Sequence, residues 1–141
     1  MAGGRGDVVG TGIDLVDVTA FAEQVGRPGT RVTDVFTAAE RRDARESATG
    51  AGPRDPRDEA ASLAARWAAK EAFKAWSESM WGEPPVMDEH VHHLIEVVRD
   101  AWGRPRIVLH GEVRKRLEGV RVHVSLSHDG TYATALVTLS R

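Results

Sequence analysis

Apolar and polar positions in the first part of the chain predict a strand followed by a short helix. Residues 8–18 are rich in β-branched side chains, which is typical of a strand. Gly10 and Gly12 lie inside this strand, and glycines at such positions indicate a bulge or the close approach of another group. A short helix is expected over residues 20–25, before a Gly- and Pro-containing turn.

Two further helices are predicted before the middle of the chain. Thr37 precedes Glu40 by three residues, which is the spacing of a capping box at the start of a helix. Residues 47–59 are rich in Gly, Pro and charged side chains and predict a loop. A long, alanine-rich helix is expected over residues 59–78.

The long helix carries a charged stripe. At about 100° per residue, Arg66, Lys70 and Lys74 fall on one side of the helix, with Trp67 and Glu71 along its edge. The opposite, apolar side consists of Ala65, Ala68, Ala69, Ala72, Phe73, Ala75 and Trp76. Core packing explains the apolar side but not the stripe, which is therefore a candidate functional feature.

The second half of the chain is predicted to be mainly β. Strands are expected over residues 94–98, 106–109, 120–125 and 132–139, with a helix over residues 111–118. Asp129-Gly130 is a two-residue hairpin signal between the last two strands. Early helices and late strands indicate the α+β class with a mainly antiparallel sheet, in a single domain that comprises residues 1–141.

The composition narrows the classes of function. A chain of 141 residues suits one domain with a core. The net charge of −2 argues against binding of nucleic acids or anionic membranes through overall charge, so an anionic partner requires a local basic cluster. The chain has no cysteine, which excludes disulfides and thiolate catalysis. It has no apolar run of membrane-spanning length and no signal-peptide pattern, so a cytoplasmic location is expected.

Two carboxylates lie where the pattern favours neutral side chains. Asp14 interrupts an apolar strand, and Glu71 lies on the edge of the long helix. Carboxylates from distant segments can meet around Mg²⁺, which prefers oxygen ligands and shares its shell with substrate phosphates. Arg66, Lys70 and Lys74 would then neutralise those phosphates. Spacing alone leaves an alternative, in which Asp14 ends its strand at the surface and Glu71 forms ion pairs along its helix.

Two histidine-containing segments are candidates for chemistry. Ser127 and His128 precede the expected hairpin, where a hydroxyl and an imidazole can bind phosphate or orient a substrate, or can simply be exposed. Residues 89–93 (EHVHH) match no standard zinc spacing and are interpreted as a solvated approach to a strand.

Five motifs occur together in this chain. They are GIDLVDV at 12–18, FTAAE at 36–40, RWAAKEAFKA at 66–75, WGRPRI at 102–107 and SLSHDGTYA at 125–133. In this combination the chain resembles the holo-acyl-carrier-protein synthases, the small phosphopantetheinyl transferases of bacteria, and in particular their actinobacterial members. The motifs extend over almost the whole chain, so the resemblance implies the 4′-phosphopantetheinyl transferase fold.

The resemblance implies a reaction and its partners. The family transfers 4′-phosphopantetheine from coenzyme A to a serine of apo-acyl carrier protein, requires Mg²⁺ and releases adenosine 3′,5′-bisphosphate. The expected partner is an acyl carrier protein, or the carrier domain of a fatty acid synthase, in fatty acid biosynthesis. The family is trimeric, with each site at a subunit interface. Neither nucleic acid nor a membrane is expected as a partner.

The resemblance also implies roles for the two carboxylates and their basic neighbours. Asp14 and Glu71 match the metal-binding acids, and Arg66 and Lys70 match basic residues that hold the phosphates of coenzyme A. Asp14, Glu71 and Lys70 are therefore the candidate catalytic residues. The proton of the serine hydroxyl is expected to pass to Glu71, directly or through a water molecule.

Other residues match the nucleotide end of coenzyme A and the docking surface of the carrier. Ser127 and His128 match the nucleotide end, and Pro105 matches a residue beside it. Acyl carrier proteins are acidic, so a cluster of basic residues on the helix after Thr37 is expected to dock the carrier. This cluster consists of Arg41, Arg42 and Arg45.

The chain departs from the family pattern at two positions. Ala20 occupies a position that is often arginine and is associated with carrier docking. The second lysine of the family's KEAxxKA pattern would fall on Ala75, but the lysine here is Lys74, rotated by about 100° on the helix. Lys74 is still expected to contact coenzyme A. Two alternatives stay open: a carrier-binding subunit of impaired activity, and another Mg²⁺-dependent enzyme that cleaves pyrophosphate.

Overall fold

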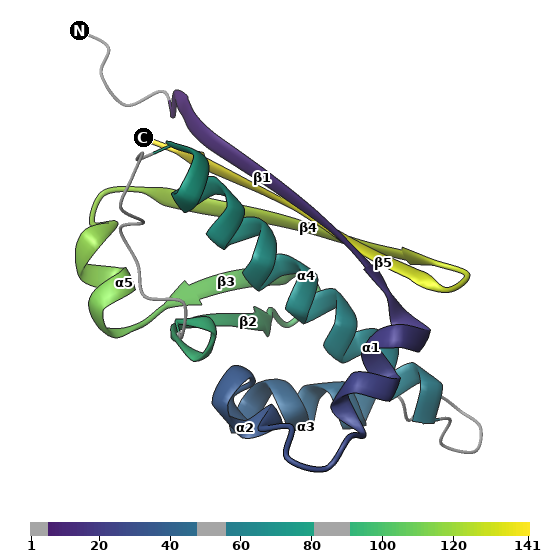
Figure 1. Cartoon of the computed structure of the whole chain (residues 1–141). Coiled ribbons are helices and arrows are strands. Elements are labelled where there is room, and N and C mark those ends of the chain that lie inside the picture. The colour runs from purple at the N-terminus through teal and green to yellow at the C-terminus, as the bar shows by residue number, and fades with distance from the viewer. Residues whose placement is uncertain (1–5, 48–55, 81–90) are drawn as a thin grey trace, which may run out of the picture.

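A long helix lies across one face of a three-stranded sheet (Figure 1). The computed structural model describes residues 6–47, 56–80 and 91–141. The sheet has the order β1 (Val8–Asp17), β5 (Tyr132–Ser140), β4 (Arg121–Asp129), and the helix is α4 (Pro56–Met80). A second sheet pairs β2 (Ile95–Arg99) with β3 (Pro105–Leu109). Every strand pair in the described residues is antiparallel, which confirms the predicted α+β class.

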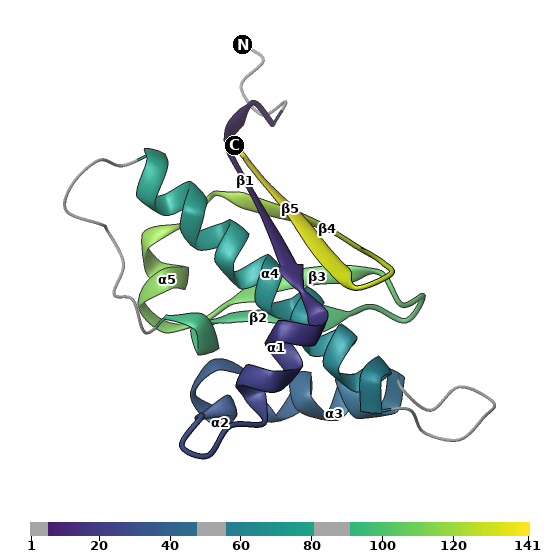
Figure 2. The same cartoon turned by 45° about the vertical axis from the view of Figure 1, so that its right-hand side comes forward.

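The other helices are short. α1 (Val18–Val25), α2 (Val32–Val35) and α3 (Ala38–Ser47) cluster against the N-terminal half of α4 (Figure 2). The connection from β3 to β4 contains α5 (Gly111–Arg116), and the 3₁₀ helix η1 (His92–Leu94) leads into β2. None of the helices in the described residues is long and apolar enough to cross a membrane.

The capping box that the sequence predicts at Thr37 is present. The Thr37 hydroxyl accepts from the backbone N–H of Glu40 at 3.2 Å, and Glu40 Oε1 accepts from the backbone N–H of Thr37 at 3.0 Å. These contacts satisfy backbone donors that the first turn of a helix leaves without partners. They explain why α3 begins at this point of the chain.

Small side chains bring α4 close to the sheet. The predicted apolar side is buried at Ala65, Ala68, Ala69, Ala72 and Phe73. Ala75 is exposed, and the side chain of Trp76 lies outside the described residues. Buried alanines let the backbones of helix and sheet approach, so the side chains beside them are held at a fixed distance from β1.

The charged stripe of α4 is buried rather than solvated. Arg66 is 1% exposed and Lys70 is 0% exposed, because α3 and β2 pack against this side of the helix. The helix is therefore enclosed on most of its circumference. Buried charges are costly unless they are paired, so the partners of these two cations decide what each of them does.

The structure differs from the sequence prediction in several boundaries. β4 continues to Asp129, which pairs with Tyr132, so the two-residue loop of the last hairpin is Gly130-Thr131, one residue later than predicted. Gly130 has a φ of +57°, which favours glycine at this position of the turn. The strands form two sheets instead of one, and α2 was not predicted. Most of the predicted loop at 47–59 lies outside the described residues.

Candidate functional site

A cavity of about 420 Å³ lies between α4 and the ends of β3 and β4. Its lining residues are Asp58, Ala61, Ser62, Ala65, Arg66, Arg99, Gly103, Pro105, Leu126 and His128. The cavity thus brings together three predicted binding residues from distant segments, Arg66, Pro105 and His128. Its lining contains two arginines and a histidine against one acidic residue, which suits an anionic ligand.

Arg66 is a buried cation whose side chain is only partly satisfied. Its Nη1 donates to the backbone carbonyl of Ser62 at 3.1 Å and contacts the Ser62 hydroxyl at 2.5 Å. Nε and Nη2 are buried and have no hydrogen-bond partner within the described residues. Burial lowers the pKa of Arg66, and the nearby charge of Arg99 lowers it further. Arginine stays protonated in proteins, so a bound anion would relieve an arrangement that is otherwise costly.

A tightly bonded turn carries Pro105 to the edge of the cavity. Asp100 Oδ1 accepts from the backbone N–H groups of Trp102 and Arg104, both at 2.9 Å, and Asp100 Oδ2 accepts from Arg104 Nε at 2.6 Å. Gly103 lies between them with a φ of +79°, a conformation that glycine adopts without strain. The WGRP motif therefore acts through the shape of a turn that ends at the cavity.

Asp14 and Glu71 come together on the helix-facing side of the sheet. Asp14 is paired with Ala135 on β5, and Ala135 is paired with the cavity residue Leu126 on β4. Asp14 thus lies about 10 Å from the wall of the cavity, because neighbouring strands are spaced at about 4.8 Å. Burial raises the pKa of Asp14, and the negative charge of Glu71 raises it further. The two carboxylates are therefore close enough to repel one another.

Glu71 is held by a histidine that is itself stacked on a tryptophan. His92 Nε2 lies 3.2 Å from Glu71 Oε1. The rings of His92 and Trp67 are stacked, with centroids 4.7 Å apart and an interplanar angle of 17°. The hydrogen bond from His92 lowers the pKa of Glu71 despite the opposing effect of burial, and the charge of His92 and then that of Lys74 lower it further.

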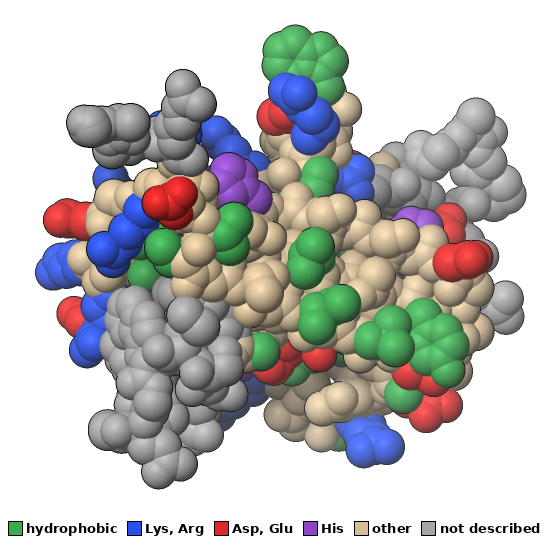
Figure 3. Space-filling view, turned by 90° about the horizontal axis from the view of Figure 1, so that it is seen from above, with side chains coloured by type: hydrophobic (Ala, Val, Ile, Leu, Met, Phe, Trp, Pro, Cys, Tyr) green, Lys and Arg blue, Asp and Glu red, His purple; other side chains and the backbone are tan. Residues whose placement is uncertain are grey.

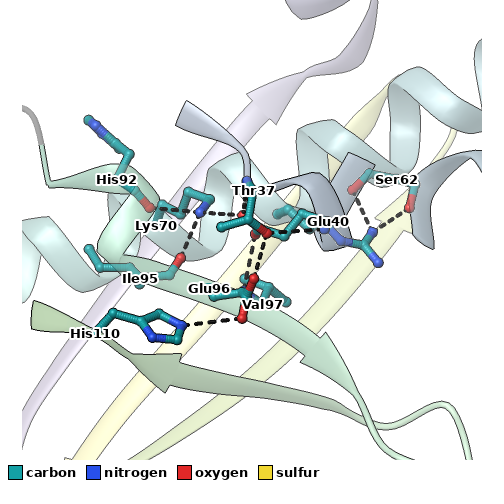
Figure 4. A network of polar contacts seen from close by, with 10 residues as sticks. Thr37, Glu40, Ser62, Lys70, His92, Ile95, Glu96, Val97 and His110 are labelled. Atoms are coloured by element: carbon teal, nitrogen blue, oxygen red, sulfur yellow. Dashed lines mark hydrogen bonds and ion pairs between the residues drawn. The ribbon is translucent and has the colours of Figure 1, made fainter. Parts of the chain in front are cut away.

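Lys70 forms a closed set of contacts inside the protein (Figure 4). Its Nζ donates to Glu40 Oε1 at 2.8 Å and to the backbone carbonyls of His92 at 2.7 Å and Ile95 at 2.6 Å. The other oxygen of Glu40 accepts from the backbone N–H of Val97 at 3.1 Å. An ammonium has three donors, and all three are used here. Lys70 therefore joins α4 to α3 and β2 in this structure, and its predicted contact with phosphate stays a prediction.

The same network continues on the other side of β2. Thr37 Oγ1 donates to Glu96 Oε2 at 2.5 Å, and His110 Nε2 lies 3.2 Å from Glu96 Oε1 (Figure 4). These contacts fix the start of α3 and the start of β2 relative to one another. The position of η1, and with it that of His92, depends on this network.

The remaining predicted residues lie at different places. Lys74 is close enough to Glu71 for its positive charge to lower the pKa of that carboxyl. Ser127 pairs with Thr134 on the face of the sheet that α4 does not cover, and it does not line the cavity. Of the arginines of α3, Arg42 and Arg45 are exposed, whereas Arg41 is half-buried and its Nε is buried without a hydrogen-bond partner in the described residues.

Several residues of the site were not predicted. The sequence predicts Glu40 only as a helix cap, but in the structure it also neutralises Lys70. His92 belongs to the segment at 89–93 that was interpreted as solvated, although its side chain is only 11% exposed; Glu89 and His90 lie outside the described residues. Arg99 had no sequence signal, because its role depends on a turn that carries it to the cavity.

The geometry suits a divalent cation and phosphates. Within the described residues no group of three or more histidine and acidic side chains could hold a metal ion. A pair of carboxylates, Asp14 and Glu71, fits Mg²⁺ better, because this ion is commonly bound by one or two carboxylates and completes its shell with phosphate and water. The mutual repulsion of these two carboxylates is what a bound cation would relieve.

Comparison with known proteins identifies the family. Residues 10–137 match the family model of the 4′-phosphopantetheinyl transferase superfamily. The chain is 51% identical to the holo-[acyl-carrier-protein] synthase of Mycobacterium ulcerans over 133 residues, which are 94% of this chain and 96% of the relative. The solved acyl carrier protein synthase of Mycobacterium tuberculosis is 46% identical, with a TM-score of 0.72, and the match covers 94% of this chain and 97% of that one. The coenzyme A complex of the Chronobacterium ammoniagenes protein is 43% identical, with a TM-score of 0.76 and coverage of 92% and 94%. The chain belongs to the 4′-phosphopantetheinyl transferase superfamily, and it resembles the holo-[acyl-carrier-protein] synthases over nearly its whole length.

Proposed function

We propose that this protein transfers 4′-phosphopantetheine from coenzyme A to a serine of an apo-acyl carrier protein, in fatty acid biosynthesis in the cytoplasm. One observation supports this most: Asp14 and Glu71 are close enough for the charge of Glu71 to raise the pKa of Asp14, and they lie near a cavity that contains Arg66, Arg99 and His128. This arrangement provides a cation site next to phosphate-binding groups. The coenzyme A complex of the Chronobacterium ammoniagenes relative is consistent with that ligand.

Different residues of the chain have different roles in the reaction. The serine oxygen attacks the phosphorus atom that bears the pantetheine group, and the bond to the departing adenosine 3′,5′-bisphosphate breaks. Asp14 and Glu71 would hold Mg²⁺, which neutralises charge on the pyrophosphate. Arg66, Arg99 and His128 bind the phosphates of the nucleotide part and hold the donor in place. Glu71 receives the serine proton, directly or through a water molecule.

The remaining basic residues support substrate binding at two places. Lys74, next to Glu71, contributes positive charge at the pyrophosphate, and Pro105 shapes the wall of the cavity. Lys70 acts indirectly, because its contacts position the segment that carries His92. The exposed arginines of α3 attract the acidic carrier protein.

The transfer is tested with apo-acyl carrier protein, coenzyme A and Mg²⁺, with intact-protein mass spectrometry as the readout. We expect the carrier to gain the mass of one phosphopantetheine group, and Glu71→Ala to reduce the rate on the order of 1000-fold. Glu112→Ala is the matched control, because Glu112 is exposed on α5. No gain of mass with the wild type, or an undiminished rate with Glu71→Ala, would refute the proposed function. Release of nucleotide without carrier would indicate a pyrophosphate-cleaving enzyme instead.

We also propose a homotrimer with the sites at subunit interfaces. Figure 3 shows hydrophobic side chains exposed among the backbone atoms on the face of the three-stranded sheet opposite α4. Large apolar side chains are exposed there: Ile13 is 68%, Leu15 is 65% and Leu136 is 45% accessible. Such a surface is typical of a face that a second copy covers. Light scattering should give three times the mass of the chain for the wild type and a smaller mass for Ile13→Lys; a monomeric wild type would contradict the trimer.

A further inference from the structure

His92 has a defined place that the proposed reaction does not use directly. Its ring nitrogen Nε2 lies 3.2 Å from Glu71 Oε1, and its side chain is 11% exposed. An ionised carboxylate can only accept hydrogen bonds, so Nε2 is the protonated nitrogen of the ring in this contact. The contact occupies one side of the carboxylate and leaves Oε2 as the oxygen that can be directed elsewhere.

Two further contacts fix the histidine. The ring of Trp67, from the same helix as Glu71 but one turn earlier, stacks on the imidazole with centroids 4.7 Å apart. The backbone carbonyl of His92 accepts from Lys70 Nζ at 2.7 Å. Lys70 and Glu71 are adjacent in sequence, so α4 holds the backbone and the ring of His92 from neighbouring positions. The contact with Glu71 is therefore built into the fold and does not rely on a freely rotating surface side chain.

We propose that His92 is a positioning residue for Glu71: it holds Oε1 so that Oε2 faces Asp14 and the divalent cation. Partners that orient metal-binding carboxylates typically change metal affinity by about 10- to 100-fold when they are removed. Such a partner is needed here because Glu71 is 32% exposed and lies close to a second carboxylate, which would otherwise drive it toward solvent. This inference rests on the proposed function of the site.

The test measures Mn²⁺ binding to the full chain by electron paramagnetic resonance, with saturating coenzyme A. His92→Phe keeps an aromatic ring on Trp67 but removes the donor, and we expect it to raise the Kd for Mn²⁺ by about 10-fold or more. His92→Gln keeps a nitrogen donor at a similar reach, and we expect a Kd within about threefold of wild type. His93→Phe is the matched control, because His93 is the exposed neighbour.

Kinetics provide a second readout. In His92→Phe, the Mg²⁺ concentration for half-maximal rate should rise, while the KM for coenzyme A at saturating Mg²⁺ should stay within about twofold. Wild-type affinity for Mn²⁺ in His92→Phe would overturn the proposal. So would an equal loss of Mn²⁺ affinity in His92→Phe and His92→Gln, provided that both variants unfold at the wild-type temperature. If the phenyl ring impairs folding, His92→Met takes its place in the same comparison. Failure of the wild type to bind Mn²⁺ or to transfer phosphopantetheine would instead refute the proposed function.

Discussion

Lys70 and Arg66 lie one helical turn apart on the same side of α4, and both are almost completely buried, yet their surroundings are opposite. The three donors of Lys70 are bonded to Glu40 and to two backbone carbonyls. Arg66 keeps two buried nitrogens without partners in the described residues and lines the cavity. The comparison indicates that a satisfied buried charge serves the fold, whereas an unsatisfied one is available to a ligand.

The first way to break this comparison is to remove the satisfied cation. Lys70→Met leaves Glu40 as a buried charge without its partner, and should lower the free energy of unfolding by about 3–5 kcal/mol. Urea denaturation measures this effect. The double variant Lys70→Met/Glu40→Gln should lose less than the sum of the two single variants, since the remaining charge is then absent.

Lys115→Met is the control for the loss of a lysine, because Lys115 is exposed on α5. It should change the unfolding free energy by less than about 0.5 kcal/mol. If Lys70→Met were equally mild, the contacts of Lys70 would not stabilise the fold.

The second test removes the unsatisfied cation. Arg66→Gln should weaken binding of adenosine 3′,5′-bisphosphate by about 10- to 100-fold, since hydrogen bonds to charged groups contribute about 1.5–3 kcal/mol. The free energy of unfolding should change little, because two nitrogens of Arg66 have no partner in the described part of the chain. Isothermal titration calorimetry measures the affinity, and Arg114→Gln on α5 is the control. Strong destabilisation with unchanged affinity would assign Arg66 to the fold.

The third and smallest effect concerns Asp14. Its folded pKa is raised, by burial and then by Glu71, so the folded state binds this proton more tightly than the unfolded state does. The ionised side chain therefore destabilises the fold above its folded pKa, and this cost disappears as the pH falls below the unfolded value of about 3.9. Asp14→Asn should raise the unfolding temperature by a few degrees at pH 8 and leave it unchanged at about pH 3. A lower unfolding temperature at pH 8 would show that Asp14 already has a stabilising partner.

The sequence predicts the elements of the fold better than the contacts between them. The capping box at Thr37, the strand that contains Asp14 and the long helix follow from local patterns, and the structure confirms them. The separation of the strands into two sheets depends on long-range packing, and the alternation of apolar and polar residues along the chain does not encode such packing. The shift of the last loop to Gly130-Thr131 is a local register effect of one residue.

For the site, the sequence identifies residue types but not their partners. Arg66, Pro105 and His128 were grouped through motif resemblance, and the structure brings them to one cavity. Lys70 belongs to the same motif, but its contact with Glu40 spans 30 residues and has no signature in the sequence. Successive side chains of a strand point to opposite faces of its sheet, so the sequence could have indicated that Ser127 and His128 face opposite sides.

The alanines of α4 have a consequence for how this protein can change over evolutionary time. Ala68, Ala69 and Ala72 are all 0% exposed and fill the contact between helix and sheet with single methyl groups. A larger residue at any of them would push α4 away from β1, and Glu71 would move away from Asp14 with it. Side chains that take no part in the chemistry thus limit which mutations the protein tolerates. Substitutions should be accepted more easily on α5 than at the contact between α4 and the sheet.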